Sequence, residues 1–293
     1  MGRDTPAAPE NRPQLYPLHY ETVIRRALSE DLGEAGDRTT DSIIPAAATA
    51  HAVLRARAPG RVAGLEAALY AFRLLDPDLA ATVHATDGSD VEAGETIATL
   101  AGRARAILTG ERTALNLLSR LCGIASAARD AQAACAGTAA RVVCTRKTTP
   151  GLRALEKYAV RMGGAGNHRF GLGDALLIKD NHIAVAGGIT AAVAAARQAA
   201  GHMAMLEVEV DTLAQLDEAL ALKVPAILLD NMSPDQLRRA VEKTAGRAVL
   251  EASGGITPDR VAEVAATGVD LISLGWLTHS AKSLDIGLDI SIA

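Results

Sequence analysis

Charged and hydrogen-bonding residues stand at the end of nearly every short apolar segment in the second half of the chain. If these segments are parallel strands, their carboxyl ends meet at one rim, where α/β proteins bind ligands and catalyse reactions. The pattern therefore predicts one polar site assembled from several strands. The residues are Thr145-Arg146-Lys147, Lys179-Asp180-Asn181-His182, Glu207-Val208-Glu209, Asp230-Asn231, Glu251-Ala252-Ser253 and Gly275.

The part of this predicted site that comes first along the chain is rich in cations, although the whole chain carries a net charge of -4. Arginine offers a planar fork that matches a carboxylate, and lysine offers a point charge. This local excess indicates an anionic small molecule as the ligand. The cations are Arg146, Lys147, Arg161, His168, Arg169 and Lys179, of which Arg161 alone is typical of a solvated surface charge.

Acidic and glycine-rich residues dominate the rest of the predicted site. Glu209 and Asp230 offer the hard oxygen ligands that a divalent cation prefers. The turn Ser253-Gly254-Gly255 lies between a predicted strand and a predicted helix, where free backbone N–H groups bind phosphate. Gly275 ends the next strand and adds a further amide. We favour a phosphate site over a plain turn.

Alternation along one segment indicates which way its carboxylates point. In Leu206-Glu207-Val208-Glu209-Val210 both glutamates share one face, and the apolar residues share the other. In a barrel the outer face packs on helices, so the glutamates are expected to point inward, where Lys147 and Lys179 could neutralise them. A purely structural network of ion pairs inside a barrel is the alternative to a functional site.

The elements that would position these residues alternate between strand and helix from residue 141 onward. Apolar runs at 141–145, 175–179, 205–210, 226–230, 248–253 and 271–275 are separated by helical patterns at 151–162, 190–200, 213–221, 234–243 and 258–267. This rhythm predicts a parallel sheet with crossover helices, as either a barrel or an open doubly wound sheet. Upstream, helical patterns at 19–29, 65–75 and 110–135 flank strand signals at 51–57 and 82–100, which predicts an α+β module.

Composition excludes several classes of protein. The negative net charge argues against a non-specific nucleic-acid or anionic-membrane binder. No apolar run reaches the ~18–20 residues that a membrane span needs. The chain has only 3 cysteines and no CxxC pair, which suits a reducing cytosol and gives neither a zinc site nor a disulfide framework. We expect a cytoplasmic protein without nucleic-acid or membrane partners, with Cys122 and Cys144 in the core.

Several motifs, in this order, resemble the quinolinate phosphoribosyltransferase family, the carboxylating nicotinate-nucleotide pyrophosphorylases. The likeness runs from about Asp31 to the end of the chain. Two departures, Ala165 and Gly173, affect only the expected loop shape. The motifs are Glu111 to Asn116, Thr145 to Arg153, Asn167-His168-Arg169, Ile178 to His182, Glu207 to Val210, Leu229 to Met232, Glu251 to Ile256 and Thr278-His279-Ser280.

The resemblance implies an α/β architecture, with an incomplete (β/α) barrel of the phosphoribosyltransferase type and a smaller N-terminal α+β sandwich domain. We expect a flexible tail at 1–17, the sandwich at 18–117, the barrel at 118–276, and a segment at 277–293 that returns to the N-terminal domain. The resemblance also implies a homodimer, or a higher oligomer built from it, in which Arg112 reaches the active site of the partner subunit.

The implied reaction transfers phosphoribosyl from phosphoribosyl pyrophosphate (PRPP) to quinolinate with decarboxylation, in the biosynthesis of NAD, and requires Mg²⁺. We assign catalysis to Lys147, Lys179, Glu209 and Asp230, the last two also holding Mg²⁺ directly or through water. Quinolinate is assigned to Arg112, Thr145, Arg146, His168, Arg169 and Lys179. PRPP is assigned to Lys147, Glu209, Asp230, Ser253, Gly254, Gly255, Gly275 and His279.

Three other functions compete with this one. A barrel lyase would use Lys147 or Lys179 as a Schiff base, which requires a desolvated lysine. A non-catalytic sensor could share the fold. A sister family linked to molybdenum loci shares the Thr-Arg-Lys and His-Arg elements, but differs at 178–182, where this chain keeps the quinolinate form.

Overall fold

The computed structural model describes residues 14–292, so most of the predicted flexible tail lies outside the described residues. The chain forms two compact units, each made of segments that are distant in the sequence. Of the described residues, the first unit holds 14–127, 149–164 and 281–292, and the second unit holds 128–148 and 165–280. No helix in the described part of the chain is long and apolar enough to cross a bilayer.

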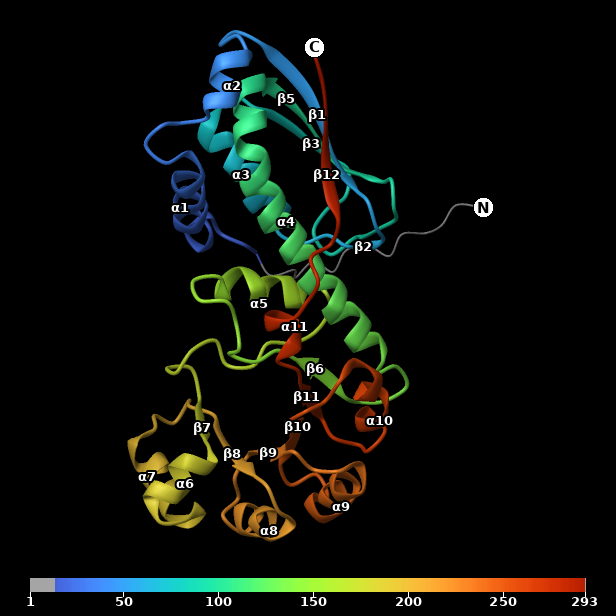
Figure 1. Cartoon of the computed structure of the whole chain (residues 1–293). Coiled ribbons are helices and arrows are strands. Elements are labelled where there is room, and N and C mark those ends of the chain that lie inside the picture. The colour runs from blue at the N-terminus through green and yellow to red at the C-terminus, as the bar shows by residue number, and fades with distance from the viewer. Residues whose placement is uncertain (1–13, 293) are drawn as a thin grey trace. The chain divides into compact units, whose positions relative to one another are not determined.

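The first unit is built on a four-stranded antiparallel sheet in the order β12-β1-β5-β3. Every second residue of β1 is buried, so one face of the sheet packs on the core and the other faces solvent. Figure 1 shows α3 and α4 alongside this sheet. The strands are β1 (Thr49–Ala56), β3 (Ala80–Val83), β5 (Thr96–Arg103) and β12 (Ile286–Ile292), and a separate small ladder joins β2 (Gly60–Arg61) to β4 (Asp90–Val91).

The helices of the first unit follow the apolar periodicity of the sequence. They are the 3₁₀ turn η1 (Pro17–His19), α1 (Glu21–Leu32), α2 (Arg38–Ile43), α3 (Leu65–Leu75), α4 (Ala104–Ala133) and α5 (Arg153–Met162). Helix α2 is not among the helical patterns expected from the sequence; it forms because the Asp37 carboxylate caps it by accepting a hydrogen bond from the Thr40 backbone N–H at 2.9 Å.

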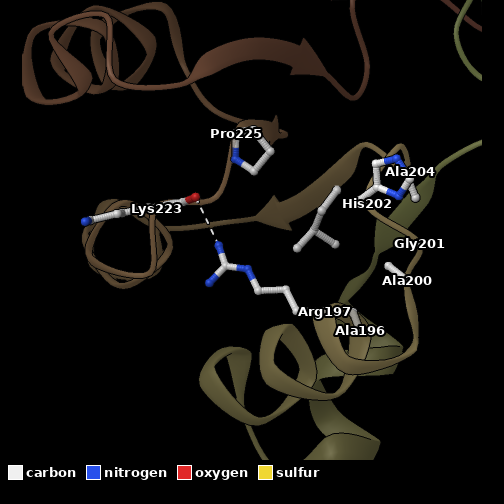
Figure 2. Close-up of a pocket in the computed structure, with 9 residues that line it drawn as sticks. Ala196, Arg197, Ala200, Gly201, His202, Ala204, Lys223 and Pro225 are labelled. Atoms are coloured by element: carbon white, nitrogen blue, oxygen red, sulfur yellow. Dashed lines mark hydrogen bonds between the residues drawn. The ribbon is translucent and has the colours of Figure 1, made fainter.

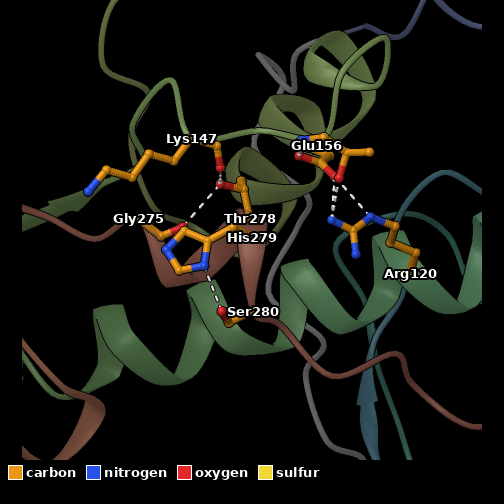
Figure 3. Close-up of polar contacts among 8 residues, drawn as sticks. Arg120, Lys147, Glu156, Gly275, Thr278, His279 and Ser280 are labelled. Atoms are coloured by element: carbon orange, nitrogen blue, oxygen red, sulfur yellow. Dashed lines mark hydrogen bonds and ion pairs between the residues drawn. The ribbon is translucent and has the colours of Figure 1, made fainter.

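Two features depart from the expected domain limits. Helix α4 runs without a break through the expected boundary at 117/118. Helix α5 groups with the first unit rather than with the barrel, because the buried Glu156 carboxylate accepts a hydrogen bond from Arg120 Nε of α4 at 2.9 Å. The Tyr158 hydroxyl also donates to the Asp87 carboxylate at 2.7 Å. The contact between Arg120 and Glu156 is drawn in Figure 3.

The second unit is a six-stranded, all-parallel sheet in the order β6-β11-β10-β9-β8-β7. The order from β7 to β11 follows the sequence without reversal, which excludes a doubly wound sheet and confirms the incomplete barrel. Strands β6 and β7 are the two edges of the sheet. The strands are β6 (Arg141–Val143), β7 (Leu176–Ile178), β8 (Leu206–Val210), β9 (Ala226–Asp230), β10 (Val249–Ser253) and β11 (Leu271–Ser273).

Helices cover the outer side of these strands (Figure 1). They are α6 (Asp180–Ala186), α7 (Ile189–Ala199), α8 (Leu213–Ala221), α9 (Pro234–Thr244), the 3₁₀ turn η2 (Pro258–Arg260) and α10 (Val261–Ala265). The short helix α11 (Trp276–His279) instead follows the carboxyl end of β11. Helices α8 and α9 begin with capping boxes, at Thr212 with Gln215 and at Ser233 with Gln236. Both cysteines expected in the core, Cys122 and Cys144, are buried.

A close backbone approach in the first unit gives a stability prediction. A Cβ atom added to Gly123 of α4 would lie 2.0 Å from the backbone oxygen of Lys282, where no atom fits. Gly123→Ala should therefore lower the free energy of unfolding by about 1–3 kcal/mol, seen as a lower thermal midpoint. Gly201→Ala is the matched control, because nothing lies within 4 Å of its added Cβ. Equal midpoints for the two variants would contradict this packing.

Candidate active site

A cavity of about 570 Å³ opens at the carboxyl ends of the second unit's strands. It is the place where the strand-end residues of the sequence converge. The predicted site residues that line it are Thr145, Arg146, Lys147, His168, Arg169, Lys179, Glu209, Asp230, Ser253, Gly254 and Gly255. Its other lining residues, to which the sequence assigned no ligand, are Leu177, Leu228, Asn231, Glu251 and Ser273.

Two arginines in this cavity hold guanidinium nitrogens that lack acceptors. Arg146 Nε and Arg169 Nε are both buried and have no hydrogen-bond partner among the described residues. Arg169 Nη1 donates to the Ala175 carbonyl at 3.0 Å, which fixes its side chain. Burial, followed by the charge of Arg146, lowers the pKa of Arg169. Two neighbouring cations with unsatisfied buried donors favour an anion with several acceptor oxygens.

A second group of residues brings an imidazole between two carboxyl groups. His168 Nε2 lies 3.0 Å from a carboxylate oxygen of Glu207 on β8, and 3.7 Å from one of Glu251 on β10. Burial, and then the charge of Glu207, raises the pKa of Glu251 to about 7, against the opposing effect of His168. These ligand atoms lie within 4.8 Å of one another. Because Nε2 already pairs with Glu207, we interpret the group as a hydrogen-bonded cluster and not as a metal site.

The carboxylates at the ends of β8 and β9 form the acidic side of the cavity. Glu209 is buried and accepts a hydrogen bond from Lys179 Nζ at 3.1 Å. Burial, followed by the charge of Asp211, raises the pKa of Asp230. Lys179 itself precedes a helix that the sequence analysis missed, since Asp180-Asn181-His182 begin α6 rather than ending a strand.

The glycine-rich turn after β10 is held in place by tight contacts. Gly254 has φ +91°, and a Cβ atom there would lie 2.2 Å from the side-chain oxygen of Asn231, so only glycine fits. The Asn231 backbone N–H donates to the Ser253 carbonyl at 2.9 Å. Trp276 Nε1 donates to the Ile256 carbonyl at 3.0 Å. The turn is therefore preorganised, with its backbone close to the acidic side of the cavity.

Gly275 and His279 were predicted in the site but are not among the residues that line the cavity. Both lie beside Lys147, which does line it. A Cβ atom on Gly275 would lie 2.9 Å from Lys147 Cδ and 3.2 Å from His279 Nε2. Thr278 Oγ1 donates to the Lys147 carbonyl at 2.7 Å, as Figure 3 shows. This contact ties α11 to the segment that carries Thr145, Arg146 and Lys147.

Arg112, by contrast, belongs to the first unit, where it is an exposed residue of α4. It is not among the residues that line the cavity of the second unit.

A second cavity of about 350 Å³ in the same unit lies between α7 and the starts of β8 and β9. It contains no carboxylate, and its arginine is already engaged. Arg197 donates to the Leu222 carbonyl at 2.7 Å and to the Lys223 carbonyl at 3.0 Å, the second of which Figure 2 shows. These bonds satisfy backbone groups that follow the end of α8. We therefore interpret this cavity as structural and place the candidate chemistry in the larger one.

Comparisons with known proteins match most of the chain, including parts of both units. The model of the quinolinate phosphoribosyl transferase N-terminal domain matches residues 37–122, and that of the C-terminal domain matches 124–289. A Bacillus subtilis protein named probable nicotinate-nucleotide pyrophosphorylase (carboxylating) is 46% identical over 276 residues, covering 94% of this chain and 95% of that one.

A Mycobacterium leprae protein named nicotinate-nucleotide pyrophosphorylase (carboxylating) is 45% identical, covering 92% of this chain and 96% of its own length. Among solved structures, NadC from Streptococcus pyogenes superposes with a TM-score of 0.92 at 39% identity, covering 96% of this chain and 99% of that one.

The hydroxyl of Thr278 gives a prediction about the site's framework. Thr278 is fully buried, and Thr278→Val removes the donor to the Lys147 carbonyl without changing the side chain's shape. We expect a loss of about 0.5–1.5 kcal/mol in the free energy of unfolding, because the hydrogen bond from this buried hydroxyl is lost. The measurement is the denaturant midpoint. Thr82→Val, on an exposed strand position, is the control and should change it little.

Proposed function

The chain belongs to the quinolinate phosphoribosyltransferase family. We propose that one side of its cavity binds quinolinate and the other side binds PRPP. The enzyme transfers phosphoribosyl from PRPP to quinolinate with loss of CO₂, giving nicotinate mononucleotide and pyrophosphate for NAD biosynthesis. The main support for this proposal is that Arg146 Nε and Arg169 Nε are buried without acceptors among the described residues, in a cavity that Glu209 and Asp230 also line.

Quinolinate binds on the cationic side of the cavity. Its two carboxylates supply the acceptors that Arg146 Nε and Arg169 Nε lack. Thr145, His168 and Lys179 line the same side, and Arg112 adds a further cation from a partner subunit. Fixed cations of this kind hold the ring in one orientation before the reaction begins, which removes orientational entropy from the barrier.

PRPP binds on the acidic and glycine-rich side. The backbone of Ser253-Gly254-Gly255 is fixed by its contacts with Asn231 and offers N–H groups to the 5′-phosphate. Lys147, with Gly275 and His279 packed beside it, binds the pyrophosphate. Glu209 and Asp230 face the ribose, where they stabilise the positive charge that develops as pyrophosphate leaves.

Mg²⁺ fits the oxygen donors of this side. Glu209 and Asp230 are carboxylates of the cavity to which we assign PRPP, and Mg²⁺ prefers hard oxygen ligands of this kind. These two residues would hold the ion directly or through water. When bound, Mg²⁺ neutralises charge on the pyrophosphate leaving group.

The chemistry needs no protein nucleophile. The ring nitrogen of quinolinate attacks C1′ of the ribosyl group as the bond to pyrophosphate breaks. When the adjacent carboxylate then leaves as CO₂, the electron pair of the broken C–C bond stays on the ring carbon, where the neighbouring N⁺ stabilises it. That carbon takes up a proton from solvent to give nicotinate mononucleotide. Lys179 Nζ donates a hydrogen bond to Glu209 at 3.1 Å and its side chain is 48% exposed, so it is not the desolvated lysine that a Schiff base requires. Positioning and fixed charges supply the rate, and removing one cation should cost on the order of 10²–10³-fold.

The assembly we propose is a homodimer in the cytoplasm, with shared active sites. The support is that Arg112 is an exposed cation on the first unit, available to a second subunit, and that a dianion in the cavity favours further cations around it.

Product formation tests the function directly. The purified protein, incubated with quinolinate, PRPP and Mg²⁺, should release CO₂ and form nicotinate mononucleotide, and EDTA should abolish the reaction. Nicotinate as the acceptor should give little product, because it lacks the second carboxylate that one of the two arginines requires. Turnover of nicotinate alone would instead indicate a non-decarboxylating enzyme, and no turnover of either acceptor would refute the function.

Subunit mixing tests the shared site. Arg112→Ala and Arg169→Ala homodimers should each be nearly inactive. Mixed at equal amounts after reversible dissociation, they should regain roughly a quarter of the parental activity, because half of the dimers are mixed and each has one intact site. The control pairs Arg161→Ala, an exposed position outside the cavity, with the parent protein. If mixed dimers form, as mass spectrometry would show, yet no activity returns, each site is complete within one chain.

A further inference from the structure

One buried carboxyl group in the active-site cavity has no part in the reaction described above. Glu251 of β10 is 2% exposed and lines the cavity. Its Oε1 atom is buried and has no hydrogen-bond partner among the described residues. His168 Nε2 lies 3.7 Å from this atom, beyond hydrogen-bond length. An ionised carboxylate in this position would be costly, because burial removes its hydration and the Ser273 hydroxyl is the one side-chain group among the described residues that hydrogen-bonds to it.

The hydrogen bonds of His168 explain why the Oε1 atom of Glu251 lacks a donor among the described residues. The Arg169 backbone N–H donates to His168 Nδ1 at 2.8 Å, so Nδ1 is an acceptor and carries no proton. The proton of the ring therefore sits on Nε2, which points at Glu207 Oε2 at 3.0 Å. One N–H cannot serve two carboxyl groups well. Glu207 receives this hydrogen bond, so Glu251 Oε1 either carries charge without a donor or the Glu251 carboxyl group holds a proton.

The groups around Glu251 favour the proton. On β9, its register partner is the apolar Leu228, and on β11 it is Leu271, with the Ser273 hydroxyl nearby. The charge of Glu207 faces it from β8 and raises its pKa, with burial, to about 7, while His168 acts in the opposite direction. The remaining charged groups of the cavity are Arg146, Lys147, Arg169, Lys179, Glu209 and Asp230.

We propose that Glu251 is a proton-linked specificity residue for the acceptor: as a neutral carboxylic acid it admits the dicarboxylate to the cavity, and as a carboxylate it repels it. This inference rests on the proposed division of the cavity between the substrates. Its physical basis is that a dianion bound at Arg146 and Arg169 shares a low-dielectric cavity with Glu251, where like charges repel strongly. Quinolinate binding and protonation of Glu251 are therefore coupled.

The direction of the pH effect follows from this coupling. Glu251 holds its proton below pH about 7 and loses it above. The KM for quinolinate should consequently rise above that pH, by up to about tenfold for each further unit, because one proton must be taken up on binding. The turnover number kcat at saturating quinolinate should change little across the same range, since the bound complex already carries the proton.

The decisive comparison uses Glu251→Gln, which keeps the shape and stays neutral at every pH. Steady-state kinetics between pH about 6 and 9 at saturating PRPP and Mg²⁺ should show a low, flat KM for quinolinate in this variant. Glu242→Gln, an exposed position on α9, is the matched control and should keep the parental profile. A flat parental profile, or a variant whose KM still rises above neutral pH, would overturn the proposal.

Proton uptake gives a readout that does not depend on turnover. The probe is phthalate, benzene-1,2-dicarboxylate, which carries the two carboxylates but lacks the ring nitrogen. Calorimetry at pH about 8 in two buffers of different ionisation enthalpy should show up to about one proton taken up by the parent protein and none by Glu251→Gln. Binding of phthalate without proton uptake, in protein that still makes nicotinate mononucleotide, would refute this inference and leave the function intact.

A second variant covers the case in which Glu251→Gln does not fold. Glu207→Gln removes the charge that raises the pKa of Glu251, so the pH at which KM begins to rise should move downward. A purely structural role for the cluster would lower the amount of folded protein without moving that pH, and this result would count against the proposal.

Discussion

Two guanidinium groups held close together at a barrel mouth repel each other, and the rest of the site is arranged around that repulsion. Neither Arg146 nor Arg169 has an acceptor for its buried Nε within the described chain. Neighbouring carboxylates make the arrangement tolerable in the empty protein, since Glu207 raises the pKa that Arg146 lowers at Arg169. A ligand rich in carboxylate oxygens would supply the acceptors that these two Nε atoms lack. Affinity for an anion therefore follows from the charges that the barrel holds at its mouth.

The parallel sheet turns sequence spacing into this arrangement. Glu207 and Glu209 lie two residues apart on β8 and share its inner face, one below the rim and one at it. The lower carboxylate meets His168, while the upper one meets Lys179. Each of the two glutamates thus has its own partner, and the rim of the barrel lies on a polar layer rather than directly on an apolar core.

The sequence allowed the rim to be predicted, because a strand end can be recognised from one segment at a time. The limits of α3 and the inward direction of Glu207 and Glu209 follow from periodicity in the same way. The helix α6 was missed because Lys179 to His182 also suits a strand end, and α2 because its cap, Asp37, also suits a loop. The cluster of His168, Glu207 and Glu251 could not be predicted, because it depends on the register of strands that are not neighbours in the sheet.

The position of β12 in the first unit has a consequence for how the protein is made. This strand pairs with β1 along its whole length, yet more than two hundred residues separate the two in the sequence. On the ribosome, every strand of the barrel is translated before residues 286–292 emerge. Until then the edge of β1 that later pairs with β12 is unpaired and could pair with another nascent chain. Rapid completion of the sheet, or a chaperone, would limit aggregation during this stage of synthesis.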